Sequence, residues 1–152
     1  MMPSLTMRGL TFFVAIGLGI PLGLGIYTYI YAKGSSYLPN DPAACANCHV
    51  MGDHYSAWLK SSHRAVAGCN DCHTPPGTIP KYLTKMSNGY HHSLAFTTGD
   101  FPDVLRIKPH NRDITEHACR KCHQAVVLAI EGPDSRHELS CIRCHDSVGH
   151  ME

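Results

Sequence analysis

The sequence is poor in the residues that build an ordinary apolar core. Its 152 residues include one Trp and four Phe, whereas Gly (13) and Pro (10) are frequent. A small domain normally depends on packed aromatic and aliphatic side chains for its stability. Because such side chains are scarce here, we expect something other than protein to fill part of the interior.

Net charge is also nearly absent. The chain has 13 Lys or Arg against 12 Asp or Glu, which gives a formal net charge of +1. Proteins that bind nucleic acid usually carry a basic excess or a basic stretch, so the sequence indicates no nucleic-acid partner. Runs of alternating apolar and polar residues, which are typical of β-strands, are not convincing anywhere. We therefore predict a mainly α fold with much loop.

One long uncharged run lies near the N-terminus, at residues 10–32. It reads LTFFVAIGLGIPLGLGIYTYIYA and is flanked by Arg8 and Lys33. A helix of this length spans about 35 Å, enough to cross a hydrocarbon layer of about 30 Å. A cleaved secretory signal is the alternative, but its apolar part usually has only about 7 to 15 residues. We predict a retained transmembrane helix in contact with membrane lipid.

Cysteine and histidine are abundant, with eight Cys and 12 His. All eight Cys fall in four copies of the pattern Cys-x-x-Cys-His, which begin at Cys45, Cys69, Cys119 and Cys141. This pattern attaches c-type haem, because two thiols on one helical turn bind the vinyl groups and the His meets the iron. Zinc sites or disulfides would also use paired Cys. They leave the four His unexplained, so we predict four covalently bound haems c.

The motifs also predict how the chain is organised. The first two begin 24 residues apart and the last two 22 apart, which suggests a duplicated two-haem unit. Covalent attachment to this motif implies the oxidising side of a bacterial cytoplasmic membrane. We therefore predict a cytoplasmic tail at 1–9, a single inner-membrane span at 10–32, and a periplasmic tetrahaem domain of short helices at 33–152. The covalent attachment residues are Cys45, Cys48, Cys69, Cys72, Cys119, Cys122, Cys141 and Cys144.

Local signals predict where several helices begin and end. Asp41 followed by Pro42 is typical of an N-cap and the first helical position. Apolar residues at helical spacing after the second motif predict a helix that Gly89 interrupts. Asp113 and Glu116 predict an acidic capping box ahead of the third motif.

Each electron-carrying haem also needs a second axial ligand, usually His or Met. Spacing alone does not select among the histidines outside the motifs, and each is equally explained as a solvated or hydrogen-bonded side chain. Met51 lies two residues after the first motif, and its thioether would raise the potential of that haem. The histidines outside the motifs are His54, His63, His91, His92, His110, His117, His137 and His150.

The arrangement resembles the NapC/NirT family of membrane quinol dehydrogenases. The likeness rests on one N-terminal anchor, four Cys-x-x-Cys-His sites and the segment CANCHVM at the first site. The segments SYLPNDPAACANCHVM, WLKSSHRA, CNDCHTP, NGYHHSLAFTTGD and CHDSVGH are most similar to the branch that forms the small subunit of cytochrome c nitrite reductase. A more distant branch feeds periplasmic nitrate reductase or other reductases. The likeness covers almost the whole chain.

The resemblance implies a set of axial ligands. The second iron would take its sixth ligand from a lysine of the catalytic partner subunit. The ligands implied within this chain are Met51 and not His49 at the first haem, His73 at the second, His123 with His150 at the third, and His145 with His63 at the fourth.

The resemblance also points to a quinol site. Lys85 matches a lysine that lines the quinol pocket of the family, although a surface lysine on an amphipathic helix is the alternative. His92 stands where some relatives have an aspartate near the first haem. It would either coordinate that haem or accept a quinol proton, since histidine titrates near neutral pH.

These features predict a menaquinol-oxidising electron conduit that passes electrons through four haems to the catalytic subunit of a periplasmic nitrite reductase. We expect no nitrite reduction by this chain alone. Three alternatives remain at this point: a quinol dehydrogenase that feeds another reductase, a passive tethered electron carrier, and a multihaem enzyme that reduces a small oxyanion at an open haem.

Overall fold

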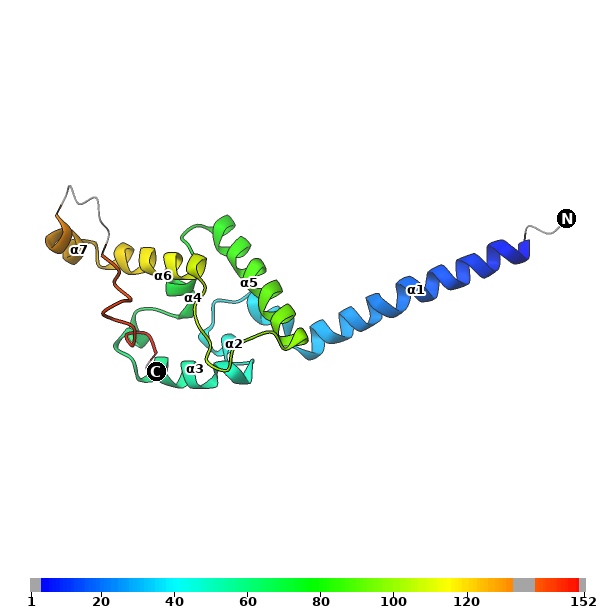
Figure 1. Ribbon diagram of the computed structural model, residues 1–152, viewed down its shortest axis with the longest axis horizontal. Helices are drawn as coiled ribbons and strands as arrows, with labels where there is room; N and C mark the ends of the chain where they lie inside the picture. Colours follow the sequence, from blue (N-terminus) through cyan, green and yellow to red (C-terminus); the bar gives the residue numbers. More distant parts are fainter. Residues whose placement is uncertain (1–3, 133–138, 151–152) are drawn as a thin grey trace. The chain divides into compact units, whose positions relative to one another are not determined.

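The computed structural model describes residues 4–132 and 139–150, and all regular structure in these ranges is helical (Figure 1). The mainly α fold predicted from the sequence is confirmed. The chain divides into two compact units, residues 1–35 and 36–152, which are described separately. The elements are α1 (Ser4–Tyr31), η1 (Gly34–Tyr37), α2 (Pro42–Cys45), η2 (His49–Met51), α3 (Gly52–Lys60), η3 (Ser62–Ala65), α4 (Cys69–His73), α5 (Thr78–Thr98), α6 (Pro109–Cys122) and α7 (Gln124–Glu131).

The first unit consists almost entirely of α1. Within it, Met7–Tyr31 has a mean hydropathy of 2.0, and its most apolar window is not buried by any other part of the structure. Its length and composition are those of a membrane span near the N-terminus. Tyr27 stacks on Tyr31 with ring centroids 5.9 Å apart. Aromatic side chains at one end of a span are typical of the membrane interface.

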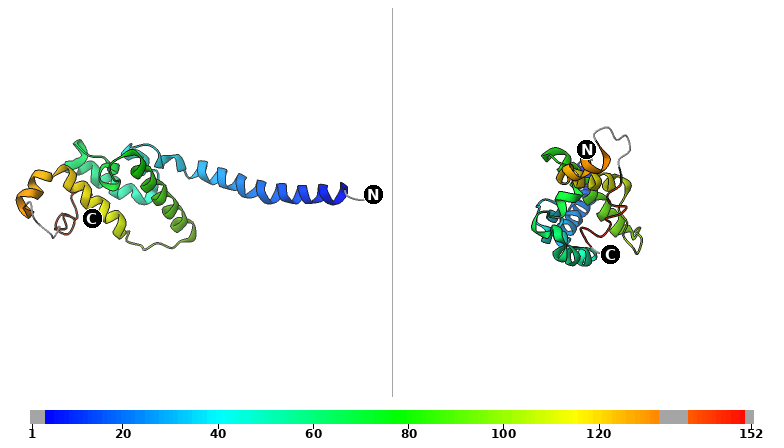
Figure 2. Two further views of the ribbon diagram at one scale, coloured as in Figure 1. Left: turned by 90° about the horizontal axis from the view of Figure 1, so that it is seen from above. Right: turned by 90° about the vertical axis from the view of Figure 1, so that its left-hand side faces the viewer.

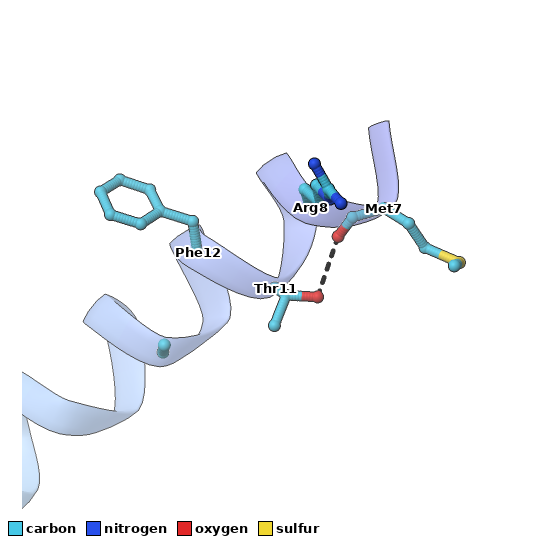
Figure 3. Close-up of a pocket in the computed structure, with 5 residues that line it drawn as sticks. Met7, Arg8, Thr11 and Phe12 are labelled. Carbon is cyan, nitrogen blue, oxygen red and sulfur yellow. Dashed lines mark hydrogen bonds between the residues drawn. The ribbon is translucent and has the colours of Figure 1, made fainter. Parts of the chain in front are cut away.

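Figure 3 shows a hollow on one side of α1, lined by Met7, Arg8, Thr11, Phe12 and Ala15. Its volume is about 460 Å³. The Thr11 hydroxyl donates to the Met7 carbonyl at 2.9 Å, so this polar group has its partner within the helix. Internal pairing of this kind is what a polar side chain in a membrane helix requires. A single helix forms this hollow, and we assign no ligand to it.

The second unit begins as the sequence predicts. The Asp41 carboxylate accepts a hydrogen bond from the backbone N–H of Ala43 at 2.9 Å, and Pro42 is the first residue of α2. The predicted N-cap is therefore confirmed. Further along, α5 ends at Thr98, where Gly99 adopts a left-handed conformation (φ 71°) that suits glycine.

Two local predictions are wrong. Gly89 does not interrupt α5, which continues through it to Thr98. A glycine in a helix interior costs only about 1 kcal/mol relative to alanine, which the turns on either side outweigh. The ring of Tyr37 packs at this position, 3.4 Å from where a Cβ would lie. Asp113 and Glu116 form no capping box, since α6 already begins at Pro109 after an N-cap at Lys108.

Protein side chains leave the core of the second unit thin. Among the described residues, Ile114 is the one buried apolar side chain, and the others that are buried are Thr74, Thr84 and Lys85. No large side chain in this part of the chain is fully buried. The scarcity of packed aromatic and aliphatic residues agrees with the composition. It leaves room between the helices for a bulky prosthetic group.

The short helices contact each other in a defined order. α2 packs against both α3 and α4, α4 packs against α6, and α6 packs against α7. The last described segment, 139–150, meets α6 at its start, where the Cys141 N–H donates to Glu116, and ends near α3 and α4, where His150 lies beside His54 and His73 (Figures 1 and 2). The second unit is therefore a set of mostly short helices linked through α4 and α6, with one longer helix, α5.

Candidate functional site

In three of the four Cys-x-x-Cys-His motifs, the five residues form one helical turn. The second motif makes up the whole of α4. In the third, the His123 N–H donates to the Cys119 carbonyl at 2.9 Å, and in the fourth the His145 N–H donates to the Cys141 carbonyl at 2.9 Å. Residues three apart on such a turn share one side, which two-point attachment of a porphyrin requires.

The first motif is built differently. α2 ends at Cys45, and Cys48 has an extended backbone (φ −84°, ψ 117°), so His49 does not continue the turn. The chain forms η2 instead, in which the Met51 N–H donates to the Cys48 carbonyl at 2.9 Å. The ring of His49 lies edge-on to Phe96, with centroids 6.5 Å apart. The first site therefore differs from the other three in its backbone.

The four motifs are neighbours in the order of the sequence. Packing of α2, which ends at Cys45, on α4, which begins at Cys69, places the first motif beside the second. The neighbouring Cys69 thiol lowers the pKa of Cys45 to about 7. Packing of α4 on α6 places the second beside the third. Burial, together with the nearby Cys141 thiol, raises the pKa of Cys119 to about 11, so the third motif is close to the fourth. The motifs thus form one continuous row.

Histidines from different motifs and loops gather along this row. The rings of His73 and His150 are nearly parallel, with centroids 6.2 Å apart, and His54 lies 4.8 Å from His150. Burial lowers the pKa of His73, and His150 and His54 lower it further. His63 lies beside His123 at 6.1 Å. These ring pairs are not the pairs that the resemblance implies for the third and fourth irons, so that assignment stays a prediction.

The residues present fit haem c. The four motifs supply eight free thiols, each pair followed by an imidazole, and the protein core around them is thin. A cavity of about 350 Å³ beside the second motif lies between α4 and α6, and Thr74, Pro75, Ile114 and Ala118 contribute to its walls. Thiols in pairs, imidazoles and apolar walls are the donor set and the surroundings that a covalently held porphyrin needs.

Lys85 is buried, with 6% of its surface exposed, so the alternative of a surface lysine is wrong. Its Nζ donates to the carbonyls of Leu38 at 3.2 Å and Pro39 at 2.8 Å, and to Asn40 Oδ1 at 3.0 Å. An ammonium has three N–H donors, and these three acceptors use all of them. Burial lowers the pKa of Lys85, and Lys81 on the same helix lowers it further. Lys85 thus fastens the segment before the first motif to α5.

His92, the other predicted quinol residue, is held by a tyrosine that sequence reasoning missed. The Tyr37 hydroxyl lies 2.9 Å from His92 Nδ1, and the Tyr37 ring packs over Gly89. Burial, with Cys48 and Cys45 nearby, raises the pKa of Tyr37 to about 12, so its hydroxyl keeps its proton. Partial burial lowers the pKa of His92, and Lys108 and His91 lower it further. No local sequence pattern indicates this pair, because the two residues are 55 positions apart.

Glu116 was also missed as a residue that organises a haem site. Its carboxylate accepts hydrogen bonds from the Ser140 hydroxyl, from the Cys141 N–H at 2.8 Å and from the Ile142 N–H at 3.3 Å. It therefore binds the start of the fourth motif.

One helical turn further along α6, Arg120 forms an ion pair with Glu131 at 2.8 Å and donates to the Leu139 carbonyl. The helix that carries the third motif thus holds the fourth through two side chains. Among the histidines considered as ligands, His137 lies outside the described residues.

Comparisons with known proteins agree with this arrangement. Residues 6–152 match the NapC/NirT cytochrome c family, N-terminal region. Cytochrome c-type protein NrfH of Wolinella succinogenes is 37% identical over 142 residues, covering 86% of this chain and 80% of the relative. Cytochrome c nitrite reductase subunit NrfH of Nitratidesulfovibrio vulgaris is 26% identical over 120 residues, covering 79% and 73%.

A solved structure has the same fold. It is a crystal structure of the cytochrome c nitrite reductase NrfHA complex bound to the HQNO inhibitor, and the matching chain has a TM-score of 0.63 and 24% identity. The match covers 97% of this chain and 90% of that one. The family match extends over nearly the whole sequence, from the membrane helix to the fourth motif. The chain therefore belongs to the NapC/NirT family of cytochromes c, whose Cys-x-x-Cys-His motifs bind haem covalently.

Proposed function

We propose that this chain is the membrane-anchored quinol dehydrogenase subunit of a cytochrome c nitrite reductase. It oxidises menaquinol at the membrane surface and delivers the electrons to a periplasmic catalytic subunit that reduces nitrite to ammonium. Membership of the family supports an anchored multihaem cytochrome. The two NrfH relatives, one of them named as a nitrite reductase subunit, support the choice of partner.

The observation that carries this proposal is the continuous row of four attachment motifs. When bound, a haem c at each motif accepts and gives up single electrons, which is the chemistry that the row needs. The chain's part is to fix the spacing. α2 packs on α4, α4 packs on α6, and Glu116 holds the fourth motif against α6.

We assign the axial ligands as the resemblance implies. The break in the turn after Cys48 supports Met51 in place of His49 at the first site, because η2 brings Met51 back to Cys48. The partner subunit would supply a lysine for the second site. The proposed ligands of this chain are Met51, His73, His123 with His150, and His145 with His63.

The quinol site is proposed at the first motif, around Lys85 and His92. Menaquinol gives up two protons with its two electrons, so the site needs a proton acceptor. It also needs a rigid wall of polar groups that holds the quinol in place. Partial burial, Lys108 and His91 lower the pKa of His92, which favours its neutral imidazole, and the hydrogen bond with Tyr37 fixes the ring. A neutral imidazole can accept a proton. Lys85 fixes the wall by holding the segment 38–40 and keeps a positive charge near Cys45.

The proposed topology places residues 1–9 in the cytoplasm, one span across the inner membrane and the haem-bearing unit in the periplasm. Covalent haem attachment on the outer side supports this orientation. The quinol then reaches the first site from the lipid, and the catalytic subunit binds the haem-bearing unit from the periplasm.

Reconstitution tests the proposal. The full-length haem-loaded protein is placed in liposomes with a menaquinol analogue, the nitrite reductase catalytic subunit and nitrite. We expect quinol-dependent nitrite consumption that requires both proteins. Nitrite consumption by this chain alone would support the oxyanion enzyme, and transfer to a nitrate reductase but not to the nitrite reductase would support the other branch. Either result contradicts the proposal.

A further inference from the structure

One face of α5 exposes a line of apolar side chains. Ile79, Leu83, Met86 and Tyr90 have 75%, 60%, 69% and 65% of their surfaces exposed. Their spacing of four, three and four residues places them on one side of the helix. We refer to these four residues as the α5 stripe; α5 is the long green helix in Figure 1.

The opposite side of α5 is polar and faces inward. Thr84 and Lys85 are buried there, and Asn88 accepts a hydrogen bond from Asn111 of α6 at 3.1 Å. A surface helix of a water-soluble domain has the reverse pattern, with its apolar side against the core. An apolar outer face of this kind marks a surface that contacts something other than water.

The first attachment motif meets α5 on a different side from the stripe. The side of α5 that meets the first motif carries Lys85, which is near Cys45, and Phe96, which contacts His49. Lys85 lies about 130° around the helix from the centre of the stripe, at 100° per residue. The first motif itself therefore meets a different face of α5 from the stripe.

The contacts of α5 favour a lipid surface as the occupant. Segment 36–40 is fastened to α5 by the Tyr37–His92 and Lys85 hydrogen bonds. In the chain it follows Tyr31, the last residue of α1, after only four intervening residues, which extend at most about 20 Å. Because segment 36–40 is fastened to α5, the membrane interface is within reach of α5.

The composition of α5 fits the same surface. Residues 78–98 contain no Asp or Glu, so no carboxylate opposes contact with anionic lipid. The stripe also ends in a tyrosine, and the half-exposed Tyr82 flanks it. Tyrosine is enriched where protein meets the boundary between headgroups and acyl chains.

We propose that α5 is an interfacial helix that rests on the bilayer, with the α5 stripe inserted at the boundary between headgroups and acyl chains. The chain then contacts the membrane at two places in the sequence, through α1 and through α5. This contact goes beyond the proposed function, because it holds whichever reductase or quinol the protein uses.

Lipid photo-crosslinking tests the contact on the unmodified protein. The full-length haem-loaded protein is placed in liposomes of phosphatidylethanolamine and phosphatidylglycerol that contain a diazirine-bearing phospholipid. After illumination, crosslinks are mapped by peptide mass spectrometry. α7 is the matched control, because it also exposes apolar residues, namely Val126, Leu128 and Ile130. We expect several-fold more crosslinked lipid on residues 79–90 than on α7.

A pair of variants sharpens the result. Leu83→Glu with Met86→Glu should remove most crosslinks from α5 and leave the visible haem spectrum unchanged, whereas Val126→Glu should leave the α5 crosslinks as they are. Equal crosslinking of α5 and α7 in the unmodified protein would overturn the proposal. Loss of the α5 crosslinks on addition of the catalytic subunit would also overturn it, because this result would identify the stripe as a protein interface.

Discussion

Replacement of Glu116 by Gln should loosen the fourth haem motif. The Glu116 carboxylate accepts from the Ser140 hydroxyl and from the N–H groups of Cys141 and Ile142. Ser140, Cys141 and Ile142 lie at the start of the turn that carries Cys144 and His145. The substitution keeps the size of the side chain and one acceptor oxygen but removes the negative charge.

The expected magnitude follows from the hydrogen bonds. A hydrogen bond to a charged group contributes about 1.5–3 kcal/mol, and a neutral one about 0.5–1.5 kcal/mol. The bonds from Ser140 and Cys141 are short, whereas the one from Ile142 is 3.3 Å and weak. A loss of about 1 kcal/mol at each short bond gives about 2 kcal/mol, which is about a 30-fold change in a local opening equilibrium.

Hydrogen exchange measures this opening. In the full-length haem-loaded protein, the amides of residues 139–145 should exchange about 30-fold faster in the Glu116→Gln variant than in the parent. Asp113→Asn, an exposed change on the same helix, is the matched control and should leave this exchange unchanged. Equal exchange in the parent and the Glu116→Gln variant would refute the reasoning.

The same carboxylate predicts a dependence on pH. Burial raises the pKa of Glu116, but the hydrogen bonds from Ser140, Cys141 and Ile142 lower it more, so the net shift is downward. A carboxyl group with a lowered pKa stabilises the fold above its unfolded pKa of about 4.3. That stabilisation is lost as the pH falls through the folded pKa. The exchange difference between the parent and Glu116→Gln should therefore disappear in acid.

Three further predictions concern the first and second haem sites. Met51→Ala should change the visible and paramagnetic resonance spectra and the potential of one haem and leave three unchanged; four unchanged haems would remove Met51 as a ligand. Lys85→Met should alter the spectrum of the first haem even without quinol, because it frees segment 38–40, whereas Lys81→Met should not; an altered quinol KM with an unchanged spectrum would instead make Lys85 a quinol contact. The isolated chain should show a haem that lacks a strong sixth ligand and becomes low-spin when the catalytic subunit is added, and a fully low-spin isolated chain would contradict the borrowed lysine.

Features that depend on neighbouring residues could be predicted from the sequence. The four motifs, the apolar helix and the Asp41 N-cap are local patterns, and each is recognisable without its surroundings. The shortage of core residues was also readable, and the structure confirms a thin core in the part of the chain that it describes.

Features that depend on distant contacts could not be predicted in the same way. Gly89 reads as a helix breaker, but it lies inside a 21-residue helix against which the distant residue Tyr37 packs. Glu116 reads as part of a cap for its own helix, but it binds backbone N–H groups about 25 residues further along. Lys85 is buried and donates hydrogen bonds to carbonyls 46 and 47 residues away in the sequence, and no local pattern reveals these contacts. In each case the partner is set by the way the second unit folds.

Reduction of the haems by quinol is the most direct test of the central claim that this chain takes electrons from the membrane. The full-length haem-loaded protein is reconstituted in liposomes without any partner and mixed rapidly with a menaquinol analogue, and the haem absorption is followed. The account predicts rapid reduction that slows in a His92→Gln variant. If a strong chemical reductant reduces the haems but the menaquinol analogue does not, the account is contradicted.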